Sequence, residues 1–179
     1  MSDHEVIAVE LSAGPHRARE AVAGVSAFLV ESRLVVPAPA DRPDWCPPLL
    51  PGPGFGSVCP DAFAPTGPYS DAGVDVRAEW GVYHPGEDVE EPVCPRCGAA
   101  VPGDYLRLVG RWDRDRSEPV VACGRCAASA PLGDWDGDLA CQAGHLAVVF
   151  RQVSEVEQEF LDDLAARLGP RTRVVHHHG

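Results

Sequence analysis

The stretch that decides the fold is HLAVVFRQVSEVEQEFLDDLAARLGPRTRVV, residues 145–175. Its first nine residues form an apolar, valine-rich run that predicts a β-strand. Ser154 and Glu157 match a capping box, which predicts that a helix starts there. One face of this helix carries the apolar residues Val156, Phe160, Leu161, Leu164 and Leu168. Gly169 ends the helix and residues 171–175 supply a second strand, so the stretch predicts a strand–helix–strand unit.

The N-terminal part of the chain predicts a second unit of the same kind. Residues 5–11, EVIAVEL, are typical of a strand, and an amphipathic helix follows over residues 15–33 with Pro15 in its first turn. Residues 74–83, VDVRAEWGVY, alternate apolar and polar side chains as a half-buried strand does. Two such units indicate an α+β protein with a ferredoxin-like β-α-β-β-α-β sheet, built by residues 5–11, 74–83, 145–153 and 171–175.

Residues 36–73 separate the first helix from the next strand and hold ten of the 18 prolines. Because proline lacks a backbone N–H and disrupts helices and central strands, we expect this segment to be irregular. The side chains of Trp45, Phe55, Phe63 and Tyr69 are interleaved with the prolines. They favour a loop that is held against the protein by its aromatic residues rather than a solvated linker.

Two Cys-x-x-Cys motifs carry the clearest chemical signal. They are Cys94-Pro-Arg-Cys97 and Cys123-Gly-Arg-Cys126, with 25 residues between them. One such turn lets two thiolates reach one ion, and two turns supply four sulfurs in a tetrahedron, which suits Zn²⁺ and leaves no open coordination position. The pattern therefore predicts one structural zinc ion per chain, bound by these four cysteines.

Two other chemistries use the same residue types. Iron–sulfur centres are also held by four thiolates, so the spacing leaves iron open beside zinc. A redox dithiol needs only one motif, and it usually accompanies a thioredoxin-like βαβ unit. Neither motif follows such a unit, which disfavours the redox interpretation.

The stretch around these cysteines resembles the zinc-ribbon family, most closely in Cys94-Pro95-Arg96-Cys97-Gly98. Residues 105–112 and 120–123 are typical of two strands that would bring the second motif beside the first. The gap between the motifs is longer than the usual spacing of roughly 15–20 residues, and Ala127 stands where ribbons usually place glycine.

We expect the chain to have three parts: the N-terminal half of an α/β domain over residues 1–91, a zinc-ribbon insert over 92–140, and the C-terminal half over 141–179.

Three further cysteines and the terminal histidines lie outside this pattern. Cys46, Cys59 and Cys141 are expected to be small buried hydrophobic residues. Cys141 and His145 would form only an incomplete second metal site, and a disulfide between Cys46 and Cys59 would need an oxidising compartment. The three histidines at residues 176–178 are a weak metal-binding run or an ordinary frayed end, and we favour the frayed end.

Composition and charge exclude several functions. All 15 basic residues are arginine, which excludes a Schiff-base lysine, a lysine general base and a phosphate-binding P-loop lysine. The net charge is −12, and residues 1–91 carry 15 acids and five bases, so nucleic acid and membrane surfaces are disfavoured partners. The sequence has no run of 18 apolar residues and no basic, signal-like N-terminus, so we expect a cytoplasmic protein.

These features favour a non-enzymatic zinc-binding protein that acts through protein–protein contacts as an adaptor or inhibitor. Its acidic N-terminal half suits a basic protein partner. Arg111, Trp112 and Arg114 lie on the ribbon and belong to residue types enriched at interface hot spots, so we expect them to contact the partner.

Two alternative functions stay open. An enzyme with a purely structural zinc would use a pocket on the sheet near the polar residues Asp75, Glu79, Tyr83 and His84. A nucleic-acid-binding ribbon would use the arginines of residues 92–140. Asp113 and Asp115 alternate with those arginines and weaken a phosphate-binding field, which places this function last.

Overall fold

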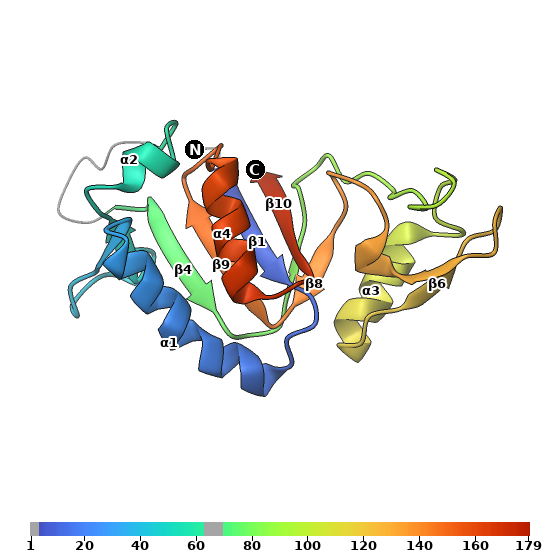
Figure 1. Cartoon of the computed structure of the whole chain (residues 1–179), viewed down its shortest axis with the longest axis horizontal. Coiled ribbons are helices and arrows are strands. Elements are labelled where there is room, and N and C mark those ends of the chain that lie inside the picture. Colours follow the sequence, from blue (N-terminus) through green and yellow to red (C-terminus); the bar gives the residue numbers. More distant parts are fainter. Residues whose placement is uncertain (1–3, 63–69) are drawn as a thin grey trace.

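The computed structural model describes residues 4–62 and 70–179, which form a mixed α+β protein (Figure 1). A six-stranded sheet has the order β10-β1-β9-β4-β3-β2, and each neighbouring pair is antiparallel. The four longest strands are β1 (His4–Glu10), β4 (Gly73–Arg77), β9 (Leu146–Arg151) and β10 (Thr172–His178). They come from the four segments that the sequence predicts, and they lie side by side.

Helices α1 (Pro15–Glu31) and α4 (Gln158–Leu168) cover one face of this sheet (Figure 1). The core between them combines alternate strand residues such as Val148 and Phe150 with Leu29 of α1 and Leu164 of α4, all fully buried. Both helices confirm the periodicity of their sequences. Burial of these apolar stripes is what holds the sheet and the two helices together.

The capping-box prediction for α4 is wrong. The helix starts at Gln158, and its cap residue Glu157 makes no side-chain capping hydrogen bond. The chain before it stays extended because Val156 is buried and the Glu157 N–H donates to the carbonyl of Val58 at 2.8 Å. Tertiary packing thus delays the helix start past Ser154.

The proline-rich segment contains more regular structure than its sequence predicts. Its described part holds strands β2 (Val35–Pro37) and β3 (Leu49–Pro51) and the short helix α2 (Phe55–Val58). The prolines are tolerated because β2 is the edge strand and β3 pairs with β4 only through Leu49, so Pro37 and Pro51 interrupt no central pairing. Phe55 is buried as expected, whereas Trp45 is 53% exposed and does not hold the loop down. Phe63 and Tyr69 lie outside the described residues.

The predicted strand over residues 74–83 is two strands that belong to different sheets. Strand β4 ends at Arg77, and β5 (Gly81–Tyr83) pairs instead with β8 (Gln142–Gly144). The break coincides with Trp80, whose indole N–H donates to the Asp113 carboxylate at 2.9 Å. The chain therefore leaves the main sheet toward the cysteine-rich part of the molecule.

Residues 92–140, called here the cysteine module, supply ten of the 12 buried residues of a second hydrophobic cluster, and Cys141 and Ala143 supply the other two. The module contains α3 (Tyr105–Asp115), the hairpin β6 (Val120–Ala122) and β7 (Ser129–Pro131), and a 3₁₀ turn (Leu132–Asp134). It lies beside the sheet, at the right of Figure 1.

The prediction of a strand over residues 105–112 is wrong, because this segment is the first part of α3. Its apolar residues Tyr105, Val109 and Trp112 are four and three positions apart, so they share one helix face and are buried together. The Asp104 carboxylate caps the helix by accepting from the Arg107 N–H at 3.1 Å. Strand β6 pairs with β7 rather than with residues 105–112.

The preferred interpretation of the terminal histidines as a frayed end is also wrong. Strand β10 continues to His178 and pairs with β1 along its whole length, with His178 opposite His4. Their rings are linked through Nδ1 atoms 3.0 Å apart.

Within the described residues, no helix is long and apolar enough to cross a membrane.

Candidate metal centre

The structure brings together the four cysteines that the sequence predicts as metal ligands. The sulfurs of Cys94, Cys97, Cys123 and Cys126 all lie within 4.8 Å of one another. The Sγ atoms of Cys94 and Cys126 are 3.7 Å apart, and those of Cys97 and Cys123 are 3.6 Å apart. In a tetrahedral site with Zn–S bonds of about 2.3 Å, neighbouring sulfurs are about 3.8 Å apart. The donor set therefore fits one metal ion, and zinc suits it.

The two cysteine motifs adopt the same backbone turn. In the first, the Gly98 N–H donates to the Cys94 carbonyl at 2.8 Å, and Gly98 has a φ of +67°. In the second, the Ala127 N–H donates to the Cys123 carbonyl at 3.0 Å, and Ala127 has a φ of +58°. Glycine adopts this left-handed conformation freely, whereas alanine carries a cost of about 1 kcal/mol or more. The fold thus imposes the turn on Ala127 despite that cost.

The backbone around the second motif favours a thiolate, which is the form that binds metal. The N–H groups of Cys126 and Arg125 point at the Cys123 sulfur and lower the pKa of Cys123 to about 6. The Arg125 nitrogen lies 3.4 Å from that sulfur. Four thiolates around one ion would fill all four tetrahedral positions, which is the arrangement typical of structural zinc sites.

Packing of the module supports the metal ligands from the inside. Cys94 and Cys123 are buried in the same hydrophobic cluster as Trp112 of α3. Trp112 is only 1% exposed, which corrects its predicted role as a partner contact: its burial builds the module instead. The flanking residues Arg111 and Arg114 are exposed on the outer side of α3.

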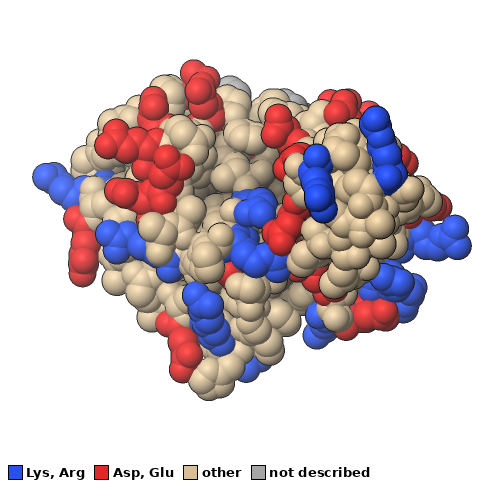
Figure 2. Space-filling view, turned by 45° about the vertical axis from the view of Figure 1, so that its right-hand side comes forward, with Lys and Arg blue, Asp and Glu red and all other residues tan. Residues whose placement is uncertain are grey.

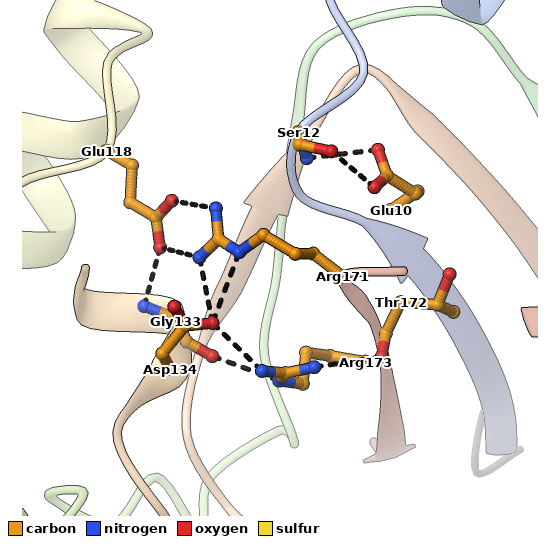
Figure 3. Close-up of polar contacts among 8 residues, drawn as sticks. All are labelled: Glu10, Ser12, Glu118, Gly133, Asp134, Arg171, Thr172 and Arg173. Atoms are coloured by element: carbon orange, nitrogen blue, oxygen red, sulfur yellow. Dashed lines mark hydrogen bonds and ion pairs between the residues drawn. The ribbon is translucent and has the colours of Figure 1, made fainter. Parts of the chain in front are cut away.

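A polar network ties the module to the last strand of the sheet (Figure 3). The Arg171 guanidinium lies 2.7 Å from the Glu118 carboxylate and 2.9 Å from that of Asp134. Arg173 also reaches Asp134 at 2.9 Å, and the Gly133 N–H donates to Glu118 at 2.8 Å. The Glu118 carboxylate beside it raises the pKa of Arg171 further above its usual range.

Sequence reasoning missed this network entirely. Glu118 and Arg171 are 53 residues apart, and Asp134 and Arg171 are 37 residues apart. No local pattern marks such a pair, because each residue looks like an ordinary surface charge when read in sequence. Only the placement of the module against β10 brings them together.

Three of the four predicted pocket residues line one cleft of about 390 Å³ on the sheet face opposite α1 and α4. Glu79, Tyr83 and His84 lie there with Glu5 and Arg77. Burial raises the pKa of Tyr83, while the charge of Arg77 acts in the opposite direction. The fourth residue, Asp75, lies outside this cleft and pairs with Arg77 at 3.2 Å.

The remaining cysteines are free and buried, as the sequence predicts. Burial raises the pKa of Cys59 to about 12, so this thiol stays protonated at neutral pH. Cys141 is held inside the module, where its backbone N–H donates to the Tyr105 hydroxyl at 2.7 Å. His145 packs edge-on against Trp80, and in the described part of the chain only the four-cysteine group gathers metal ligands.

Comparison with protein-family models, with curated proteins and with solved structures found no match in any of the three.

Proposed function

We propose that this protein is a non-enzymatic zinc-binding protein in which the metal holds the cysteine module as a rigid protein-interaction surface. The observation that carries the proposal is the pairing of a closed four-sulfur site with an exposed helix. Trp112 and Val109 anchor α3 to the cluster around the cysteines, while Arg111 and Arg114 face outward. A preformed surface loses little conformational entropy when it docks, which favours binding.

The proposal includes the organisation of the chain. The four longest strands lie side by side in the order β10, β1, β9 and β4, and α1 and α4 cover one face of the sheet. When these strands are numbered one to four along the chain, their order across the sheet is 4-1-3-2. This order supports a ferredoxin-like domain in which residues 92–140 form a zinc-ribbon-like insert between its two halves. The ferredoxin-like arrangement hosts many unrelated functions, so it supports the architecture and not the activity.

The contact can be tested with a photoactivatable amino acid placed on α3 in living cells. Gly110 is a suitable position because it is exposed beside Arg111 and an added side chain there meets open space. Gly24 on α1 is a matched control, since it is also an exposed helical glycine with open space around it.

We expect a discrete crosslinked protein at position 110 that is absent at position 24. It should disappear in the Cys94→Ser, Cys123→Ser double variant, because the module then loses its metal. The absence of a zinc-dependent crosslink at position 110 would contradict the proposal.

A second candidate function is an enzyme, favoured by the cleft that collects Glu79, Tyr83 and His84. Convergent polar groups in a concave site are the usual setting for a small ligand. A thermal-shift screen with a metabolite library tests it. A compound that raises the Tm of the native protein, but not that of Glu79→Gln, would move this function to first place.

A further inference from the structure

Most arginines of the cysteine module form no ion pair in the described structure, unlike the four arginines in or next to the longest sheet strands. Arg77, Arg151, Arg171 and Arg173 of the sheet each lie against a carboxylate. Of the six arginines in the module, Arg114 alone forms an ion pair among the described residues, with Asp115 at 3.6 Å. Figure 2 shows the arginines spread over the module on the right, while a dense acidic patch lies at the upper left.

The helical form of α3 gathers three arginines on one face, and Asp115 lies against only the last of them, Arg114. Arg107, Arg111 and Arg114 are four and three residues apart and therefore share the outer helix face. Asp113 faces elsewhere, because its carboxylate accepts from the Trp80 indole at 2.9 Å. In an extended strand, Arg107 and Arg111 would share one face with Asp113 and Asp115, so the predicted strand underestimates this positive surface.

Two further acids of the module are neutralised from the sheet side. Glu118 and Asp134 both pair with Arg171, so their charges are compensated at the contact between module and sheet. The Asp104 carboxylate is used to cap α3 through the Arg107 N–H. The outer face of α3 is therefore more positive than the net charge of −1 for residues 92–140, with seven acids and six arginines, would suggest.

The three arginines border a hollow of about 350 Å³ that also has apolar walls. Its lining includes Pro102 and Leu108 beside Arg107, Arg111 and Arg114. It also includes one acid, Asp104, which caps α3 by accepting from the Arg107 N–H. Guanidinium groups bind carboxylates with two parallel hydrogen bonds, and the apolar walls can take a hydrophobic side chain. A surface of this kind fits a chain that carries both acidic and apolar groups.

We propose that this arginine face binds an acidic protein segment in which carboxylates flank one apolar side chain. The inference rests on the proposed function and names its partner class. Along α3, Arg107 and Arg114 are about 10 Å apart. In an extended peptide, side chains on the same side recur about every 6.8 Å, so two or three alternate acidic residues span the arginines.

The same chemistry argues against a nucleic acid on this face. The backbone of a nucleic acid duplex presents phosphates and sugars and keeps its bases stacked inside, so it offers no hydrophobic side chain to the walls formed by Pro102 and Leu108. The net charge of −12 also repels a long polyanion. A short acidic segment interacts mainly with the arginines that it contacts. An acidic peptide is therefore the favoured occupant.

The test uses the full-length zinc-loaded protein and fluorescence anisotropy at physiological salt. The probe is a labelled 12-residue peptide with glutamate at alternate positions around one leucine. The comparison probes are the same peptide with glutamine or lysine in place of glutamate, a 12-nucleotide single-stranded DNA and a short RNA duplex.

The variant Arg107→Glu, Arg111→Glu reverses the charge of the face. Its matched control, Arg19→Glu with Arg33→Glu, makes the same change in net charge at two exposed arginines outside the module. Zinc content and circular dichroism establish that both variants are folded.

We expect micromolar binding of the glutamate peptide, weakened at least tenfold in the Arg107→Glu, Arg111→Glu variant and unchanged in the control. The lysine peptide should bind that variant better than the native protein. Absence of binding, or binding insensitive to the reversal, overturns the inference. Tighter binding of DNA or RNA that is lost in the same variant overturns it in favour of nucleic acid.

The crosslink at position 110 separates this inference from the proposed function. If a zinc-dependent protein crosslink forms, but the glutamate peptide added to a cell lysate before irradiation does not reduce its yield, the partner class is wrong and the interaction surface stands. If no crosslink forms at all, the proposed function itself fails.

Discussion

The sheet region, meaning the six-stranded sheet with α1 and α4, and the cysteine module use different means to hold their structures. Apolar side chains on both faces of β1 and β9 are fully buried, and 20 buried residues make up the larger cluster of the sheet. The module cluster has 12 buried residues, three of them cysteines, and its hairpin strands are three residues long. A small core of this kind needs additional stabilisation, which the four-sulfur site can supply.

The largest expected effect is loss of the metal. In the Cys94→Ser, Cys123→Ser double variant, we expect the module to unfold while the sheet persists, because structural zinc contributes about 10 kcal/mol or more to small domains. Elemental analysis should find one zinc per native chain and none in the variant. Hydrogen exchange should become fast in β6 and β7 and stay slow in β1 and β9. Retained protection in β6 would show that apolar packing alone holds the module.

The reverse experiment weakens only the sheet. Leu164 is fully buried in α4 against the sheet core, so Leu164→Ala should lower the free energy of unfolding by about 2–5 kcal/mol. The zinc content of the folded protein should not change. Denaturant titration measures the first quantity and elemental analysis the second. Loss of zinc in this variant would mean that the module depends on the sheet for its fold.

A smaller effect is expected where the two regions meet. Arg171→Ala removes the partner of Glu118 and Asp134 at a partly exposed site, so we expect a loss of about 1–2 kcal/mol. A double-mutant cycle with Glu118→Ala should show coupling between the two residues. Additive losses in the cycle would indicate that the network does not connect the regions energetically.

The pH dependence of the sheet region has a defined sign. Burial raises the pKa of Cys59 from its ordinary value of 9.0 to about 12, so unfolding above pH 9 releases the thiol proton. Stability is fully present below pH 9 and falls as pH rises toward 12, by at most about 1.4 kcal/mol per pH unit from this group. Denaturant titrations at pH 8 and pH 10 measure it, with Cys59→Ala showing a smaller difference. An equal difference in both proteins would point to other groups.

The smallest effect compares the two cysteine turns. Ala127→Gly relieves the left-handed backbone at +58° but makes the unfolded chain more flexible, so we expect a gain of at most about 1 kcal/mol in module stability. Gly98→Ala should lower module stability by a similar amount, because it places a side chain on a backbone with a φ of +67°. The added methyl group meets open space, so no steric clash adds to this loss. Rates of zinc transfer to a chelator compare the two variants. Faster transfer from Ala127→Gly would contradict the expectation.

Sequence patterns predicted those parts of the molecule that depend on local spacing. The valine-rich run over residues 145–153 and the helix face through Leu161 and Leu164 were confirmed, because burial imposes a period on such segments. The spacing of Cys94 and Cys97 is also a local signal, because a short turn brings their two sulfurs together. It correctly predicted that these cysteines belong to the four-sulfur group. The predicted burial of Cys46, Cys59 and Cys141 was also confirmed.

The errors fall where more than one period fits or where contacts are distant in sequence. Tyr105, Val109 and Trp112 lie on one helix face, yet the same segment is rich in strand-forming residues, so it was predicted as a strand. The turn at Trp80 away from the sheet depends on Asp113, 33 residues later. The Arg171 network has no local signature at all.

The pairing of β5 with β8 has a consequence for protein engineering. Gly81 lies opposite Gly144 and Tyr83 opposite Gln142, so the strands that lead into and out of the module are hydrogen-bonded neighbours. A tight hairpin turn could join Tyr83 to Gln142 and excise everything between them at little loop-closure cost. The two ends of the inserted segment are therefore adjacent, so it could be grafted into the hairpin turn of another protein. Its removal would leave Arg171 and Arg173 without their carboxylates, so a shortened protein needs neutral residues at these two positions.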